Sequence, residues 1–173
     1  VMDAALAELE LREDITLDGF ATFVRSQYHP ADITHLTGAE SQFIYAVVHT
    51  TLRRSGAMSA AQRLRRALID TVWQPLRGVR EDCRALFSDL AEIIDRSSRR
   101  RTITLSTDKH RAYPRALAGV AVLARALRAG RLVHRRVSSR AARTRANPLF
   151  AVNYTDRQLR KNLAEATGEA SCI

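Results

Sequence analysis

Asp108 ends a short β-branched stretch and is the only carboxylate in a long basic segment. Residues 96–145 contain 15 Lys and Arg residues and this single acid, whereas the rest of the chain has 13 basic and 17 acidic residues. An acidic residue at the carboxyl end of a strand in an α/β sheet lies where such folds bind ligands. The structural alternative is an aspartate that only caps a helix or stabilises a loop.

Two further aspartates could contribute to the same site. Asp18 lies inside the β-branched and aromatic stretch 15–24, where a charge needs a partner or a metal ion. Asp156 lies near the expected start of the last helix. The N-cap of this helix is either Asn153 or Thr155, and Thr155 would form a capping box with Gln158. The alternative role of Asp156 is purely structural, because a negative charge in a first helical turn favours the helix dipole.

Three carboxylates on separate elements suit phosphodiester cleavage or transfer at neutral pH. Two Mg²⁺ ions about 4 Å apart, or Mn²⁺ in their place, activate the attacking oxygen and stabilise the leaving oxygen. Mg²⁺ prefers hard oxygen ligands and keeps several waters, so a few carboxylates suffice. Because the chain has 18 acidic residues, these three gain meaning only from the elements that would bring them together.

Hydrophobic periodicity predicts three strands, two helices, and then strand, helix, strand and helix. The expected strands cover 15–24, 33–36, 43–50, 102–107 and 132–137. Four helices are expected: one after the capping box of Ser59 and Gln62, one over 79–94, one from Pro114 to Gly130, and one after Asn153 at the end of the chain. The turn at 38–41 makes the first three strands an antiparallel meander. This order predicts an α/β, ribonuclease-H-like fold, a mixed sheet of about five strands flanked by helices.

The length and the net charge of the chain favour one domain that binds a polyanion. The 173 residues are interpreted as a tail or linker at 1–14 and a core at 15–173 that continues beyond the C-terminus given. The net charge of +10 is concentrated in the arginine-rich segment 96–145 and indicates nucleic acid as partner. The alternative explanations for the excess of arginine are a coding bias toward this residue and a basic face that is only solvated.

Candidate phosphate contacts lie after the Asp108 strand, within the expected strand 132–137 and in the loop that follows it. They are Lys109, His110, Arg111, Arg135, Arg136, Arg140, Arg143 and Arg145.

The sequence argues against a disulfide framework, a zinc site and a membrane span. Cys83 and Cys172 form no CxxC pair, which favours reduced thiols and a cytoplasmic location, and no apolar run is long enough for a membrane span. His29, His35 and His49 lack the spacing of zinc ligands.

Four segments resemble bacterial insertion-sequence transposases of the DDE type. They are Leu17-Asp18-Gly19-Phe20, the run from Arg53 to Gln62, the segment Ser106-Thr107-Asp108-Lys109-His110-Arg111-Ala112-Tyr113-Pro114-Arg115-Ala116, and Asn147-Pro148-Leu149-Phe150-Ala151-Val152-Asn153. The likeness covers nearly the whole chain from about residue 15. It implies a ribonuclease-H-like catalytic core, related to retroviral integrases, in which three acids bind divalent metal.

By that resemblance Asp18 is the first acid and Asp108 the second. Asp156 is the expected third, because Asn153-Tyr154-Thr155-Asp156-Arg157 is similar to the Asn-x-x-Glu-Arg helix start of related transposases, with Asp in place of Glu. Glu169 and Glu165 are the alternatives.

The resemblance also implies a function and its partners. We expect nicking of transposon-end DNA and joining of the freed 3′-hydroxyl to target DNA, with two Mg²⁺ (or Mn²⁺) ions, by a homo-oligomer on DNA associated with the bacterial nucleoid. A nuclease of the same fold and a decayed, DNA-binding remnant are the alternative functions.

Overall fold

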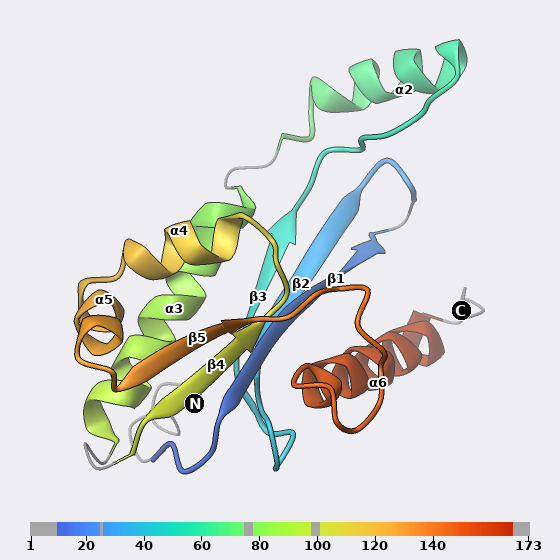
Figure 1. The fold of residues 1–173 in the computed structure, drawn as a ribbon. Helices are drawn as coiled ribbons and strands as arrows, with labels where there is room; N and C mark the ends of the chain where they lie inside the picture. The colour runs from blue at the N-terminus through green and yellow to red at the C-terminus, as the bar shows by residue number, and fades with distance from the viewer. Residues whose placement is uncertain (1–9, 25, 75–77, 98–100, 168–173) are drawn as a thin grey trace.

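The computed structural model describes residues 10–24, 26–74, 78–97 and 101–167, with the backbone alone at 165–167. Five strands form one mixed sheet in the order β3-β2-β1-β4-β5 (Figure 1). The strands are β1 Ile15–Phe23, β2 Pro30–Gly38, β3 Ile44–Thr51, β4 Ile103–Thr107 and β5 Leu132–Arg136. β1, β2 and β3 pair antiparallel, whereas β4 pairs parallel with both β1 and β5. This topology is ribonuclease-H-like and confirms the predicted fold class.

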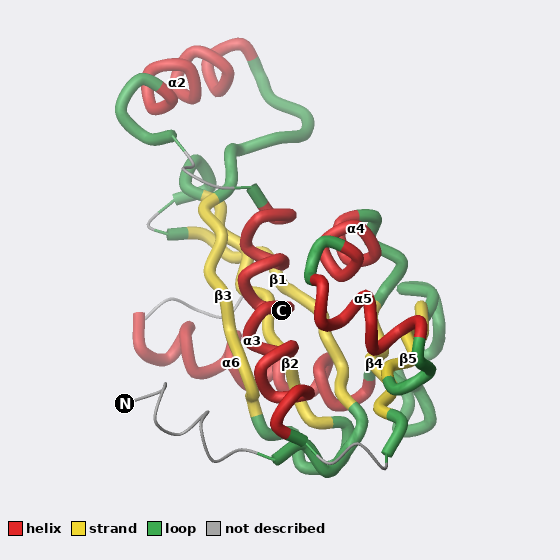
Figure 2. Tube along the Cα trace, turned by 90° about the vertical axis from the view of Figure 1, so that its left-hand side faces the viewer, coloured by secondary structure: helices red, strands yellow, loops and turns green. Residues whose placement is uncertain are grey.

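Helices cover the two faces of the sheet unequally. They are α2 Ala60–Asp70, α3 Val79–Arg96, α4 Ala112–Ala118, α5 Ala121–Arg128 and α6 Phe150–Thr167. Three of them, α3, α4 and α5, pack on one face, α6 packs on the other, and α2 stands apart from both (Figures 1 and 2). None of the helices in the described ranges is both long and apolar enough to span a membrane.

Strand alternation divides the residues of β1 between the two faces. Ile15 and Leu17 are buried in the main core with Leu86, Phe87 and other residues of α3, while Asp18 and Phe20 point to the α6 side. Burying each such aliphatic or aromatic side chain contributes roughly 1.5–3 kcal/mol. The α3 core therefore holds β1 in place and fixes the position of Asp18 on the opposite face.

The predicted helix between Pro114 and Gly130 is two helices. The N–H of Gly119 donates to the carbonyls of Ala116 and Arg115, and Val120 is extended, so the chain turns before α5 begins. Gly130 has φ +66°, the left-handed conformation that commonly follows a helix end and that glycine adopts without strain.

The start of the last helix differs from the prediction. Asn147 Oδ1 accepts a hydrogen bond from the N–H of Leu149 at 2.9 Å, and the N–H of Phe150 donates to the Asn147 carbonyl, so α6 begins at Phe150. The Thr155 hydroxyl donates to the Ala151 carbonyl, as mid-helix threonines do. The predicted caps at Asn153 and Thr155 are therefore wrong, and Asp156 lies inside the helix rather than in its first turn.

Helix α2 forms an arm that projects beyond the sheet. The predicted capping box of Ser59 and Gln62 is present. The predicted apolar stripe is also present, but Leu64 and Leu68 are 66% and 64% exposed.

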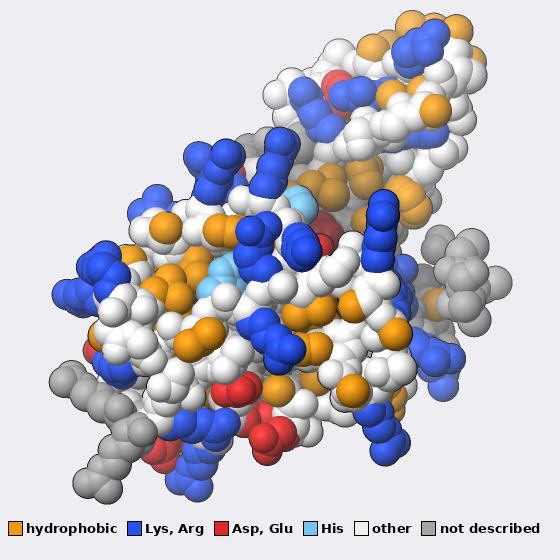
Figure 3. Space-filling view, viewed as in Figure 1, with side chains coloured by type: hydrophobic (Ala, Val, Ile, Leu, Met, Phe, Trp, Pro, Cys, Tyr) orange, Lys and Arg blue, Asp and Glu red, His pale blue; other side chains and the backbone are white. Residues whose placement is uncertain are grey.

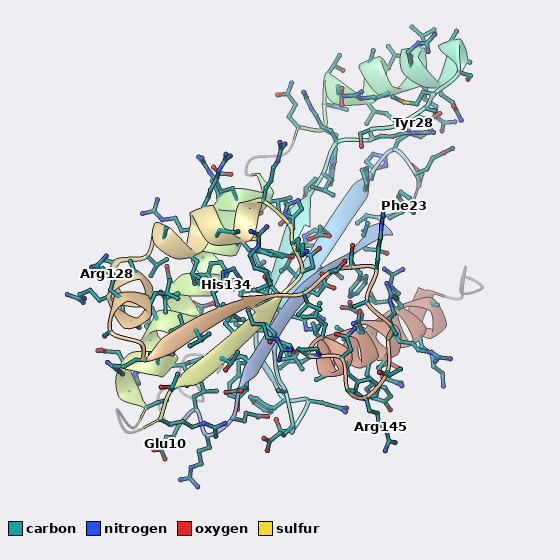
Figure 4. The ribbon with its side chains drawn as sticks, in the orientation of Figure 1. Glu10, Phe23, Tyr28, Arg128, His134 and Arg145 are labelled. Carbon is teal, nitrogen blue, oxygen red and sulfur yellow. The ribbon has the colours of Figure 1, made fainter. Side chains whose placement is uncertain are left out.

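Aromatic contacts fix the arm to the β1–β2 hairpin, where Figure 4 labels Tyr28. The guanidinium groups of Arg54 and Arg65 lie 4.7 Å and 5.1 Å from the centre of the Tyr28 ring. Each is a cation–π contact, worth about 0.5–1 kcal/mol at an exposed site. His29 and Trp73 add an edge-to-face contact at 5.2 Å.

A buried carboxylate fixes the turn between β2 and β3. Glu13 accepts hydrogen bonds from the Ser41 hydroxyl, the Tyr45 hydroxyl and the backbone N–H groups of Glu40 and Ser41. Burial by itself raises the pKa of Glu13, but these hydrogen bonds outweigh it and hold the pKa below its usual value. A Cβ at Gly38 would collide with the Glu13 carboxylate and the Ser41 hydroxyl, so a larger residue here would disturb this hydrogen-bond network.

Candidate active site

The strand register brings Asp18 and Asp108 together. In the parallel pair of β1 and β4, Leu17 lies opposite Thr107, so the two aspartates occupy the next positions on neighbouring strands. Both line one small pocket, which the loop after β5 and the start of α6 complete. The pocket is lined by Asp18, Asp108, Ser138, Ser139, Ala141, Arg143, Asn147, Leu149 and Asn153.

The charge of Asp18 is costly in this position. Burial raises its pKa to about 6, although a hydrogen bond from the Gly19 N–H lowers it, and the negative charges of Asp108 and Asp156 raise it further. Asp108 and Asp156 are therefore both close enough to Asp18 to act on it electrostatically. A divalent cation would relieve this repulsion.

The Asp108 carboxylate is held by the loop that follows it. Its Oδ1 accepts a hydrogen bond from the N–H of His110 at 2.7 Å, so it also has the structural role of a loop aspartate. The Thr107 hydroxyl donates to the Asp108 carbonyl at 2.7 Å and lies 2.9 Å from His134 Nε2. Arg136 Nη2 donates to the Lys109 carbonyl at 3.1 Å, which ties this loop to β5.

Asp156 faces the same region from α6 but is engaged by a buried histidine. His35 Nε2 lies 2.7 Å from Asp156 Oδ1, and His35 Nδ1 lies 2.6 Å from the Thr37 hydroxyl. His35 is fully buried on β2 and pairs with Asp18 in the antiparallel register. Asp156 does not line the pocket that Asp18 and Asp108 share.

The donor chemistry of the pocket fits a hard divalent cation. Asp18 and Asp108 offer carboxylate oxygens, and Asn147 and Asn153 could add amide oxygens, all of which Mg²⁺ and Mn²⁺ accept. Within the described ranges, no three His, Cys, Asp or Glu side chains are grouped closely enough to hold a metal ion. Of the alternative third acids, Glu169 lies outside the described residues, and the Glu165 side chain is not described either.

A small second core positions the basic loop beside this pocket. Val137, Leu149 and Val152 pack together with Ala141, which joins the end of β5 to the start of α6. The loop between them carries Arg140, Arg143 and Arg145.

All eight candidate phosphate contacts are exposed. Figure 3 shows Lys and Arg side chains around the middle of this face, while Asp and Glu side chains near its lower edge lie beside further Lys and Arg side chains. In Figure 4, His134 lies on β5 and Arg145 on the loop before α6, so the basic residues span both elements. Burial and the nearby Arg136 charge lower the pKa of His134, so His134 adds no positive charge at neutral pH.

His35 is the site residue that sequence reasoning missed. Its spacing from the other histidines fits no metal motif, so it was not a candidate. A usable signal was the hairpin itself: a turn centred between residues 26 and 27 places His35 directly opposite Asp18.

No protein-family model, curated protein or solved structure matches the chain. Its function is therefore inferred from the fold and the arrangement of these residues.

Proposed function

We propose that the chain is the catalytic core of a DDE-type transposase of a bacterial insertion sequence. The observation that carries this proposal is that Asp18 and Asp108 share one pocket with Arg143, beneath an arginine-rich loop. Carboxylates are hard ligands suited to Mg²⁺ and a guanidinium is suited to phosphate, so their proximity on a ribonuclease-H-like sheet supports the proposal. The resemblance of the segments around Asp18, Asp108 and Asn147 to such transposases supports the same function.

Each group has a distinct role in the proposed reaction. Asp18 and Asp108 hold divalent metal, with Asp156 as the third acid, and we propose two ions, Mg²⁺ or Mn²⁺. When bound, these ions supply Lewis-acid activation of the attacking oxygen and stabilise the leaving oxygen. Arg143 and the neighbouring exposed basic residues hold the DNA phosphates and orient the scissile strand. The partners are transposon-end and target DNA, bound by a homo-oligomer.

The first test is Mn²⁺ binding by calorimetry on the whole chain. We expect Asp18→Asn and Asp108→Asn each to weaken Mn²⁺ binding by at least about tenfold, because each removes a charged ligand from one shared site. Asp95→Asn, an exposed aspartate on α3, is the matched control and should leave the affinity unchanged. Binding that is absent in the wild type, or insensitive to both substitutions, would overturn the proposed metal site.

A second test separates transposase from nuclease. The chain is incubated in Mn²⁺ with supercoiled plasmid and a labelled duplex that carries free 3′-hydroxyl ends. Label joined to the plasmid, and lost in Asp18→Asn and Asp108→Asn, supports strand transfer. Nicking without joining supports a nuclease of the same fold, and DNA binding without either reaction supports a decayed remnant.

A further inference from the structure

We propose that His35 is a positioning residue that orients the Asp156 carboxylate toward the cation held by Asp18 and Asp108. This inference rests on the proposed function. It adds a residue with no ligand role of its own that acts through Asp156.

The contact between His35 and Asp156 has a defined donor and acceptor. A carboxylate only accepts hydrogen bonds, so His35 Nε2, at 2.7 Å from Asp156 Oδ1, is the donor. His35 Nδ1 lies 2.6 Å from the Thr37 hydroxyl. Both ring nitrogens are therefore used, which fixes the orientation of the ring.

The His35 ring is supported by buried neighbours. His35 is 0% exposed, and the Thr16 hydroxyl on β1 donates to the Thr37 carbonyl at 3.1 Å. A side chain that is packed on all sides and bonded at both ends cannot follow a moving partner. It thus sets the position of Asp156, rather than the reverse.

The fixed His35 ring determines where the Asp156 carboxylate lies relative to Asp18. His35 lies opposite Asp18 in the register of β1 and β2, so its bond holds Asp156 on the side of α6 that faces Asp18. Asp156 does not line the pocket, but its side chain is 13% exposed and only its Oδ1 has a hydrogen bond among the described contacts, so Oδ2 is the atom we propose as the ligand. Partners that hydrogen-bond a ligating carboxylate commonly contribute 10–100-fold to metal affinity.

The test compares two polar substitutions of different reach. The amide N–H of a glutamine can take the place of Nε2–H, whereas the shorter asparagine reaches only the position of Nδ1. We expect His35→Asn to weaken Mn²⁺ binding by about 10–100-fold and His35→Gln to keep an affinity close to that of the wild type. His49→Asn, an exposed histidine on neighbouring β3, is the matched control and should have no effect.

A double-mutant cycle separates positioning from a merely structural role. If His35 acts through Asp156, His35→Asn will weaken Mn²⁺ binding no further in an Asp156→Ala background. Cooperative thermal unfolding of each variant verifies that it is folded. If His35→Asn does not fold, Thr37→Val takes its place. This substitution removes the hydroxyl beside His35 Nδ1 and should also weaken Mn²⁺ binding.

The inference is overturned if a folded His35→Asn chain binds Mn²⁺ like the wild type, or if Asn and Gln at this position lose affinity equally. It is also overturned if the losses from His35→Asn and Asp156→Ala simply add. Failure of the proposed function looks different: there the wild type itself does not bind Mn²⁺, or Asp18→Asn and Asp108→Asn have no effect.

Discussion

At the scale of single residues, the candidate site is a place where the fold carries an unfavourable charge. Asp18 lies half-buried in the middle of β1 with two other aspartates near it, and its pKa is raised to about 6. Such perturbed groups concentrate at functional sites because function, rather than stability, requires them there.

The first prediction at this scale concerns stability against pH. The pKa of Asp18 is higher in the folded chain, about 6, than its ordinary value of 3.8, so folding favours the protonated form. The contribution of Asp18 to stability is therefore present at low pH and is lost as pH rises through about 6. Asp18→Asn should stabilise the chain at pH 7 by on the order of 1–3 kcal/mol and by almost nothing near pH 4.

Urea unfolding of the wild type and of Asp18→Asn at both pH values measures this difference. Asp95→Asn serves as the control, since its carboxylate is exposed. A stabilisation of equal size at both pH values would show that the ionisation of Asp18 is not its cause.

At the scale of elements, α2 differs from the other described helices because none of its residues is buried. Its position depends on the cation–π contacts of Arg54 and Arg65 with the Tyr28 ring and on the contact of His29 with Trp73, rather than on a core. Its apolar stripe consequently contributes little to folding.

The prediction for this element compares two leucines of equal size. Leu64→Ala should change the free energy of unfolding by no more than about 0.5 kcal/mol, because the side chain is 66% exposed. Leu90→Ala on α3, which is 1% exposed, should cost about 2–5 kcal/mol through lost burial and the cavity left behind. Equal losses in urea unfolding would mean that α2 packs against another surface in solution.

Much of this arrangement could be predicted from local patterns. The strand alternation, the α3 stripe and the Ser59 capping box are short-range signals, and the structure confirms them. The pairing of Asp18 with Asp108 could be anticipated because one lies within a central strand and the other at the end of its parallel neighbour. The exposure of Leu64 could not, since periodicity shows that a helix has an apolar face and not whether anything covers it.

The surroundings of Asp156 show why part of the candidate site could not be predicted from the sequence. The sequence has a capping-box pattern at Thr155, but in the structure the turn at Asn147 precedes α6, which begins at Phe150. The contact between Asp156 and His35 joins residues 121 positions apart in the chain. It depends on how α6 packs across the sheet, which no local pattern encodes.

At the scale of the whole molecule, the two faces of the sheet have different tasks. The face under α3, α4 and α5 contains the main core, while the face under α6 carries Asp18, His35 and the contact to Asp156. The basic loop borders that second face and leaves its arginines exposed.

The prediction at this scale concerns binding to duplex DNA. Replacing Arg140, Arg143 and Arg145 together by alanine should weaken binding at low salt and lower the slope of log K against log salt by roughly one per arginine, because each contact releases a counterion. Arg128→Ala on α5, which lies on the far side of the molecule from Arg145 in Figure 4, should alter neither quantity. Equal effects of these arginines in fluorescence titrations at several salt concentrations would argue against a defined phosphate-binding face.

Residues 96–145 contain 15 basic residues and one acid, whereas the rest of the chain has 13 basic and 17 acidic residues, so the molecule has an electric dipole as well as a net charge. A polyanion approaching from any direction exerts a torque that turns the basic side toward it, so orientation precedes contact. The benefit appears in the association rate, which steering of this kind raises and which salt depresses, more than in the lifetime of the complex. Neutralising acids outside residues 96–145 would weaken the dipole but raise the net positive charge, so association with the polymer would become faster and less strongly oriented.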